Sequence, residues 1–490
     1  MSERNPRGKD LSPRRAVIVG GGISGLAAAH RLQELGRARG LSIDARVLES
    51  ASRLGGQVRT WRDGGFLFEG GPDSMVTQKP SGLELCRRLG LESQIIYPVL
   101  AQAGMQVVHC GRLVRLPEGF LMVAPSRMLP LLRSPLFSWR GKIRMAMERF
   151  VPRRGPRVHD ESPRQFVTRR FGSELYERAV EPIVGGLFTA DADKLSLRMT
   201  MPRFLELERR HGSLTTGMAR VMQKRSGSGR RAPAVFSLKG GVENLVATLT
   251  SRLPQGSSIT GAPVERIRFD AMRSMWKVRA SERTELDAEV LILACPSYVS
   301  APLLESVDSE LSGLLARLEY ASCVTVNLAY RPRQMRRRLD GYGFFVPRGE
   351  GLPLLAANYV SAKFAGRAPN GALLLRAFLG GATAPGILDR TDHELVDEAH
   401  RTLSGLLEIA GQPLLSAVHR APRSMPQFPV GDAERLARLD ERLAGHPGLL
   451  LCGGAVGAVG LPDCIASGER AARAALGFLR NEPRELELAI

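Results

Sequence analysis

A glycine cluster near the N-terminus has the residue types and the spacing that phosphate binding needs. Gly20, Gly22 and Gly25 follow the apolar run "RAVIV" and open "ISGLAAAHRLQELG", which has helical spacing. The first glycine permits a tight turn, the second lets the backbone approach a pyrophosphate, and the third lets the helix pack on the strand. The helix N-terminus then offers N–H groups and a positive dipole to the phosphates. The residues predicted to contact a dinucleotide here are Gly20, Gly21, Gly22, Ile23, Ser24 and Gly25.

The segments that follow distinguish between the possible dinucleotides. "DARVLES" predicts a second strand and brings Glu49 to the distance where a carboxylate accepts hydrogen bonds from a ribose 2′-hydroxyl, which disfavours NADP. A second set of small residues comes next, and an extended FAD needs such a close backbone approach beyond its pyrophosphate, whereas free NAD does not. We therefore expect FAD. The residues expected to bind it in these segments are Glu49, Ser50, Arg53, Gly55, Gly56, Gly71, Pro72, Asp73 and Ser74.

A third glycine-rich stretch, "CGGAVGAVGLPDC" at 452–464, could be a metal clip, a covalent cofactor tether, a second nucleotide loop or an ordinary turn. A metal site is disfavoured because the two cysteines are widely spaced and no histidine accompanies them. The apolar run before the stretch and the helical pattern after it predict a backbone that passes close to the flavin ring, with helix N–H groups facing it. The predicted contacts are Gly453, Val459, Gly460 and Leu461. A tether through cysteine stays open.

The chain of 490 residues is long enough for two or three domains that position these loops. Helical spacing prevails between about 83 and 231, and strand patterns return afterwards. We expect an α/β fold, α+β overall, with a Rossmann-type FAD-binding domain built from discontinuous segments. The predicted parts are a lead at 1–13, the FAD-binding domain at 14–82, 232–300 and 420–490, a helical domain for membrane contact or a substrate channel at 83–231, and a sheet-containing substrate-binding domain at 301–419.

Composition narrows the possible partners. The start of the chain is polar and no apolar run is long enough for a spanning helix, so we expect a cytoplasmic protein. The net charge of +20 comes mainly from scattered arginines, and no nucleic-acid-binding pattern accompanies it. Segment 121–154 mixes Leu, Met, Phe and Trp with Arg and Lys, which favours peripheral contact with an anionic membrane. A helical segment packed on the protein's own core is the alternative.

Four further stretches carry a resemblance to a known family. The chain is similar to the FAD-dependent amine-oxidase-like flavoproteins, and within them to the oxygen-dependent protoporphyrinogen or coproporphyrinogen oxidases of haem synthesis. The stretches occur in the family's order and the resemblance covers nearly the whole chain. They are "VEPIVGGLFTADADKLSLRMTMPRFLELERRHGSL" (180–214), "FSLKGGVENLVATL" (236–249), "GYGFFVP" (341–347) and "GLPDCIASGERAA" (460–472).

The resemblance implies oxidation of a porphyrinogen to a porphyrin in three two-electron steps, with hydride passing to flavin and electrons then to dioxygen, which yields hydrogen peroxide. It implies noncovalent FAD and hand-over of a poorly soluble product to the next haem-pathway enzyme. Val264 matches a strand that holds the adenine through its backbone. A carbonyl near Gly186 would face the pyrrole N–H groups. Phe364 would pack on the macrocycle, with ordinary core packing as an equal alternative.

Several positions depart from the family's pattern. Met105 stands where plant-type members have an arginine that pairs with a substrate propionate, so Arg112, Arg115 or Arg367 could replace it. The predicted substrate-binding residues are Gly186, Phe364, Arg367 and Met105. The tail also departs at Gly454, Val456 and Pro462. The alternatives are a carotenoid desaturase or amine oxidase of the same fold and, in another class, a non-catalytic FAD-binding partner of the haem pathway.

Overall fold

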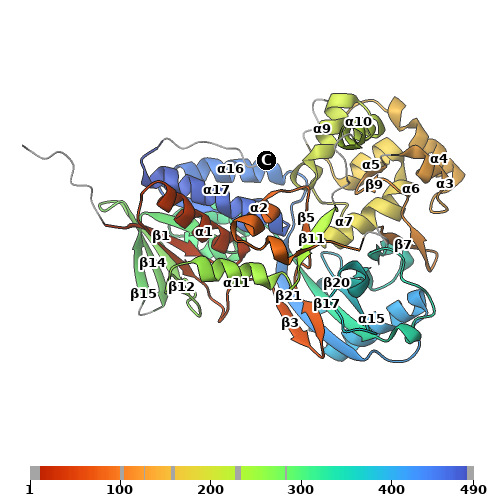
Figure 1. Cartoon of the computed structure of the whole chain (residues 1–490). Coiled ribbons are helices and arrows are strands. Elements are labelled where there is room, and N and C mark those ends of the chain that lie inside the picture. The colour runs from red at the N-terminus through yellow and green to blue at the C-terminus, as the bar shows by residue number, and fades with distance from the viewer. Residues whose placement is uncertain are drawn as a thin grey trace, which may run out of the picture.

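The computed structural model describes residues 12–99, 104–125, 127–155, 160–226, 233–281 and 284–482, so most of the expected lead at 1–13 lies outside the described residues. Figure 1 shows a parallel sheet flanked by long helices on one side of the molecule and a larger mixed sheet on the other, with a group of helices above the mixed sheet. Segments far apart in the sequence meet in each part, which is the mixed α/β architecture predicted.

The parallel sheet has five strands in the order β12-β2-β1-β16-β22. β1 pairs with β2 and with β16, so Val17 lies beside Arg46 on one side and Leu291 on the other. β1 and β16 are apolar runs because a central parallel strand is covered on both faces. Strands from three separate stretches of the chain thus form one sheet, as expected. Their bounds are β12 (Ser258–Ile259), β2 (Ile43–Leu48), β1 (Arg14–Val19), β16 (Val290–Leu293) and β22 (Leu449–Leu451).

Two hydrophobic cores cover the two faces of this sheet. The first lies beneath α1 (Ile23–Ala38), α2 (Ser81–Arg88), α11 (Glu243–Arg252) and α17 (Leu461–Leu479). The second lies beneath a three-stranded antiparallel sheet and three helices. They are β13 (Arg266–Asp270), β14 (Met275–Ser281), β15 (Thr284–Ala288), α12 (Ser297–Leu304), α13 (Ser309–Ala316) and α16 (Asp432–Ala444). α12 spans the expected start of the substrate domain at residue 301 and α13 lies within that domain, yet both helices pack on the parallel sheet.

The mixed sheet has seven strands in the order β21-β17-β20-β19-β18-β7-β8. α15 (Asp392–Leu407) packs on one of its faces. β7 and β8 come from the segment expected to be helical, and β7 pairs with β18, much later in the chain. Such a tertiary pairing has no local sequence signal, and the domain boundaries stay predictions. The bounds are β21 (Leu415–Pro426), β17 (Tyr320–Tyr330), β20 (Leu373–Gly380), β19 (Leu354–Asn358), β18 (Gly343–Phe345), β7 (Gln106–His109) and β8 (Arg112–Arg115).

The helical part has a hydrophobic core of its own. Its α5 begins after Ser162, whose hydroxyl accepts from the Gln165 N–H while the Gln165 side chain accepts from the Ser162 N–H. No helix in the described ranges is long and apolar enough to cross a membrane. The elements are β9 (Phe120–Leu121), β10 (Ala124–Pro125), α3 (Met128–Arg133), α4 (Trp139–Ala146), η3 (Met147–Phe150), α5 (Pro163–Phe171), α6 (Ser173–Leu175), the π-helix η4 (Tyr176–Val180), α7 (Glu181–Phe188), α8 (Leu197–Thr200), α9 (Pro202–His211) and α10 (Leu214–Ser226).

Short strands connect the parallel sheet to the mixed sheet. β11 pairs with β5 at one end and with β6 at the other. β3 and β4 form a hairpin that leads into residues 70–74. The bounds are β3 (Thr60–Asp63), β4 (Phe66–Glu69), β5 (Met75–Val76), β6 (Ile95–Ile96) and β11 (Val235–Leu238). The remaining short helices are η1 (Glu92–Gln94), η5 (Pro332–Gln334), η6 (Arg348–Glu350), α14 (Val360–Lys363), η7 (Pro385–Asp389) and η8 (Gly453–Val456).

Candidate functional site

The first glycine loop joins β1 to α1 and needs glycine for steric reasons. Gly20 has φ +107°, and a Cβ at Gly25 would lie 2.0 Å from the Gly20 carbonyl oxygen, so the helix can follow the strand this closely only with glycine there. Gly22 is the residue before the first turn of α1, and a Cβ there would meet nothing within 4 Å. The loop therefore combines a tight helix–strand contact with open space beside Gly22, which fits a pyrophosphate.

Glu49 follows β2 and turns toward this loop. One carboxylate oxygen accepts from the Gly21 N–H at 2.7 Å, and the other accepts from the Ala51 N–H at 2.8 Å. The Ala262 N–H donates to the Glu49 carbonyl at 2.8 Å, which brings the loop containing Val264 alongside. The structure thus gathers the residues predicted for the adenosine end of FAD. Ser50 also lies here, where its hydroxyl donates to Glu49.

The second glycine loop lies directly against the first. The Gly55 N–H donates to the Gly21 carbonyl at 2.8 Å, and Gly55 and Gly56 both have positive φ, +108° and +55°. Arg53 closes this loop from inside by donating to the carbonyls of Leu54, Gly56 and Val58. The two loops were predicted separately and are in contact.

Residues 70–74, which we call the flank loop, contact two buried charges, Lys363 of α14 and Arg376 of the mixed sheet. Lys363 lies 3.3 Å from the Asp73 carboxylate and donates to the Ser74 hydroxyl at 3.1 Å. Arg376 donates to the carbonyls of Gly70 and Gly71. Burial alone would raise the pKa of Asp73, but the charges of Lys363 and Arg376 outweigh it and hold that pKa at about 2. Asp73 is therefore an ionised anchor of the loop.

Glu69 precedes the flank loop, and its pKa is shifted in the opposite direction to that of Asp73. It is 3% exposed and accepts from the Thr60 hydroxyl at 2.6 Å and from the Val242 N–H at 2.9 Å. Burial raises the pKa of Glu69 to about 7 despite these hydrogen bonds. Two neighbouring carboxyl groups thus titrate at very different pH because only Asp73 has a cation at short distance.

The C-terminal glycine stretch packs against the start of α1. The Gly453 N–H donates to the Ser467 hydroxyl at 3.0 Å, and a Cβ at Gly468 would lie 2.1 Å from the Ser24 carbonyl oxygen. Gly460 precedes α17, whose first residue is Leu461. The stretch is therefore part of the same site as the first loop. Val459 lies in the turn between η8 and α17.

Burial favours the neutral thiol form of both cysteines in this stretch. Burial raises the pKa of Cys464 to about 11, and it also raises the pKa of Cys452. The described residues contain no cluster of His, Cys, Asp and Glu that could hold a metal ion.

On the substrate side, Gly186 of α7 lies against the mixed sheet. A Cβ at Gly186 would be 2.6 Å from the Phe345 ring and 3.4 Å from the side chain of Ala356. Met105 and Phe378 pack on the same small hydrophobic cluster. Gly186 and Met105 therefore lie against the same cluster, and their assignment to the substrate stays a prediction. Sequence reasoning missed the two aromatic residues, although both stand in strand-like runs, "GYGFFVP" and "GALLLRAFLGG", that it had recognised.

Phe364 and Arg367 lie in a different environment. Phe364 is fully buried, with the charged ends of Lys363 and Arg367 beside its ring. Arg367 donates to the Ser237 hydroxyl and to the carbonyls of Leu238 and Lys239. The guanidinium thus already has partners within the protein, and the assignment of both residues to the substrate stays a prediction.

The two other arginines considered for a propionate differ in position. The Arg115 guanidinium lies 3.0 Å from where a Cβ at Gly104 would be, beside Met105, and it pairs with Asp340 at 3.2 Å. Arg112 stands at the opposite end of the β7–β8 pair, across from His109. Of the two, Arg115 is the one placed next to Met105.

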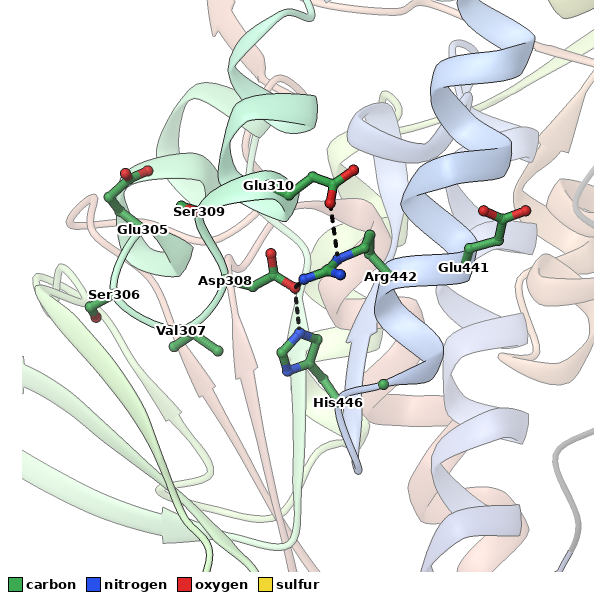
Figure 2. A pocket seen from close by; sticks show the side chains of 10 residues that line it. Glu305, Ser306, Val307, Asp308, Ser309, Glu310, Glu441, Arg442 and His446 are labelled. Atoms are coloured by element: carbon green, nitrogen blue, oxygen red, sulfur yellow. Dashed lines mark hydrogen bonds and ion pairs between the residues drawn. The ribbon is translucent and has the colours of Figure 1, made fainter.

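A separate surface recess lies between the α12–α13 turn and the end of α16. Figure 2 shows Asp308 near its centre, pointing toward Arg442 and His446. Asp308 accepts from the Leu311 N–H and from His446 Nε2 at 2.8 Å, and these partners outweigh burial and hold its pKa at about 2. None of the lining residues belongs to the predicted site. The Asp308 contacts therefore have a structural explanation as the N-terminal cap of α13.

Known proteins with similar sequences are flavin-dependent oxidoreductases, in agreement with the glycine loops described above. Residues 23–476 match the family model described as flavin containing amine oxidoreductase. The chain belongs to that family. Coproporphyrinogen III oxidase of Bacillus subtilis is 31% identical over 95% of this chain and 98% of its own length. Protoporphyrinogen oxidase 1 of Spinacia oleracea chloroplasts is 30% identical, covering 94% of this chain and 84% of its own length.

A solved structure supports the fold over the full length. The crystal structure of a candidate protoporphyrinogen oxidase from Exiguobacterium sp. 255-15 superposes with a TM-score of 0.82 and 28% identity, covering 96% of this chain and 99% of that one. The resemblance to porphyrinogen oxidases noted in the sequence motifs and the predicted fold class are thereby confirmed.

Proposed function

We propose that this chain oxidises protoporphyrinogen IX or coproporphyrinogen III to the corresponding porphyrin, with FAD as cofactor and dioxygen as electron acceptor. Each turnover to porphyrin removes six electrons and six protons, which reduce three dioxygen molecules to three of hydrogen peroxide. The observation that carries the proposal is the close packing of Gly186 of α7, which belongs to a stretch that resembles the porphyrinogen oxidases, on Phe345 of the mixed sheet. FAD accepts hydride and passes electrons to dioxygen when bound.

The chain's own residues would hold FAD along its length. The Gly20–Gly25 loop and the α1 N-terminus would bind the pyrophosphate, and the Glu49 carboxylate would accept from the ribose. Gly55 and Gly56 would let the ribityl chain pass, and the flank loop and the stretch from Gly453 to Leu461 would lie beside the ring. The raised thiol pKa values of Cys452 and Cys464 support noncovalent binding, since a thioether requires an accessible thiolate.

The decisive test is anaerobic mixing of the FAD-loaded protein with each porphyrinogen. Bleaching of the flavin absorbance by either substrate supports the proposal, and steady-state rates with both porphyrinogens identify the physiological class of substrate. Bound FAD with no bleaching by either substrate would overturn it and favour the non-catalytic alternative. A phytoene-type substrate serves as control for the carotenoid desaturase alternative.

We also propose that the protein acts in the cytoplasm and that α4 and η3 contact an anionic membrane surface, where the poorly soluble product could pass to the next haem-pathway enzyme. Trp139 is 75% exposed and Phe150 is 70% exposed, and Ile143 lies exposed between them. The exposed Arg149 places its charge over the Phe150 ring, and Arg140, next to Trp139, is also exposed. Exposed apolar groups beside basic ones suit acidic headgroups.

Vesicle flotation tests this contact. We expect the protein to float with phosphatidylglycerol-containing vesicles and less with neutral ones, and we expect the Trp139→Ala, Phe150→Ala variant to lose that binding. Met272→Ala is the matched control, because Met272 is also exposed but lies in the β13–β14 turn. Equal flotation of both variants would contradict the proposed contact.

A further inference from the structure

Arg376 stands in the middle of β20 and reaches from the mixed sheet to the flank loop. The residue is 2% exposed. Its Nη2 donates to the Gly70 carbonyl at 2.7 Å and to the Gly71 carbonyl at 2.5 Å. These two carbonyls belong to residues three and two positions before the Asp73 anchor. One side chain of the mixed sheet thus fixes the backbone of the loop predicted to flank the flavin.

The same guanidinium also contacts the substrate side. It lies 4.7 Å from the centre of the Phe378 ring, two residues along the same strand and on the same face. Phe378 packs on the hydrophobic cluster that contains Phe345 and Ala356, against which Gly186 lies. Arg376 therefore connects the flank loop to the cluster proposed to receive the porphyrinogen.

Arg376 forms no ion pair within 4 Å in the described structure, although the charge of Asp73 acts on it from a longer distance. Its direct acceptors are neutral carbonyls, and its Nε has no hydrogen-bond partner among the described residues. On the strand directly beside it, the buried amide of Asn327 also lacks partners in that part of the chain. A buried guanidinium without a paired anion is costly, because the interior solvates charge poorly. A bound group that develops negative charge would offset this cost.

We propose that Arg376 is a positioning residue that holds the Gly70–Gly71 turn against the bound flavin and supplies positive charge that favours the reduced, anionic cofactor. The inference rests on the proposed FAD site. A cation in a dry interior acts over several ångströms with little screening, so it need not touch the ring. Charge near a flavin is one of the means by which a protein sets its reduction potential. Lys363 adds to this field, but its charge is paired with Asp73.

Three variants separate the effect of the hydrogen bonds from Arg376 to the loop carbonyls from the effect of its positive charge. Arg376→Met removes both, Arg376→Lys keeps the charge and loses the paired hydrogen bonds, and Arg376→Gln keeps a donor for one carbonyl and loses the charge. Arg435→Met is the matched control, since Arg435 is a buried arginine of α16 that pairs with Asp432, apart from the predicted site. The probe is FAD itself, through the midpoint potential of the bound cofactor and its dissociation constant by fluorescence titration.

We expect Arg376→Met and Arg376→Gln to weaken binding of reduced relative to oxidised FAD by about tenfold, which lowers the two-electron midpoint potential by about 30 mV. Arg376→Lys should keep the potential near the wild-type value and lower kcat with porphyrinogen because the turn is less firmly held. Arg435→Met should leave the potential unchanged. An unchanged potential in Arg376→Gln would overturn the inference, and if Arg376→Met does not fold, the Gln and Lys variants decide.

Failure of this inference and failure of the proposed function give different results. A protein whose potential responds to Arg376 as expected, but whose flavin is not bleached by either porphyrinogen, would reject the substrate and retain the role of Arg376. If the protein oxidises porphyrinogen but the Arg376→Gln variant has the wild-type flavin potential, the proposed function is retained and the role of Arg376 is rejected.

Discussion

At the adenosine end of the proposed FAD site the chain relies on backbone geometry, whereas at the end near the mixed sheet it relies on buried charges. The first end consists of glycine loops in direct contact and one carboxylate, Glu49, that caps backbone N–H groups. The second end consists of Glu69, Asp73, Lys363 and Arg376, contributed by segments almost three hundred residues apart. Substitutions at the adenosine end should therefore weaken FAD binding by steric exclusion. Substitutions at the end near the mixed sheet should act through electrostatics.

The largest effect is expected from Gly25→Val in the first loop. A Cβ there would lie 2.0 Å from the Gly20 carbonyl oxygen, and backbone cannot yield as a flexible side chain can. We expect the dissociation constant of FAD to rise by about a thousandfold, about 4 kcal/mol. Fluorescence titration of the apoprotein measures it. Gly313→Ala in α13 is the control, because a Cβ there meets nothing within 4 Å, and it should bind FAD normally. Tight FAD binding by Gly25→Val would contradict the steric account.

The second prediction concerns pH and separates the two carboxyl groups beside the flank loop. The pKa of Glu69 is about 7, raised by burial from 4.5, so the folded state holds a proton that the unfolded state loses above pH 4.5. The free energy of unfolding should therefore decrease between pH 4.5 and 7, by about 3 kcal/mol in all, relative to Glu69→Gln. Denaturant unfolding of both proteins across that range checks it. A constant difference between them would show that Glu69 titrates normally.

Asp73 should show the opposite dependence. The charges of Lys363 and Arg376 outweigh burial and lower its pKa from 3.8 to about 2, so its stabilising contribution is complete above pH 3.8 and is lost as the pH falls toward 2. Asp73→Asn should abolish that acid-dependent loss. The same unfolding measurements below pH 4 test it, with Glu69→Gln as control because that variant keeps the loss.

The contrast between the two ends also explains what could be predicted from the sequence. The glycine loops and Glu49 were predictable because a strand, a turn and a helix are adjacent in the chain and each glycine has a steric reason. The discontinuous parallel sheet was predictable because buried parallel strands are continuous apolar runs. Arg376 was not, since one arginine in an apolar strand gives no indication of which loop it reaches. β7 was missed for the same reason, because its partner β18 lies far along the chain.

A smaller effect is expected from Gly186→Ala in α7. Its Cβ would lie 2.6 Å from the Phe345 ring, so the aromatic side chain must move within the proposed substrate cluster. We expect kcat/KM with porphyrinogen to fall about tenfold, about 1.4 kcal/mol, while FAD affinity stays unchanged. Gly185→Ala is a matched control, because a Cβ at the neighbouring position meets its nearest atoms at an ordinary 3.8 Å. Equal kinetics for the two variants would remove Gly186 from the substrate side.

The smallest effect is expected from Phe364→Leu, which separates core packing from contact with the macrocycle. Phe364 is fully buried between Lys363 and Arg367, whereas Phe378 packs on the cluster that Gly186 meets. We expect Phe364→Leu to lower the free energy of unfolding by about 1 kcal/mol and to leave KM for porphyrinogen within about threefold of wild type. Phe378→Leu, the matched change at the other aromatic, should raise KM more than it lowers stability. If Phe364→Leu instead raises KM as Phe378→Leu does, then the macrocycle reaches Phe364, and the substrate side extends to Lys363 of α14 and the Asp73 anchor.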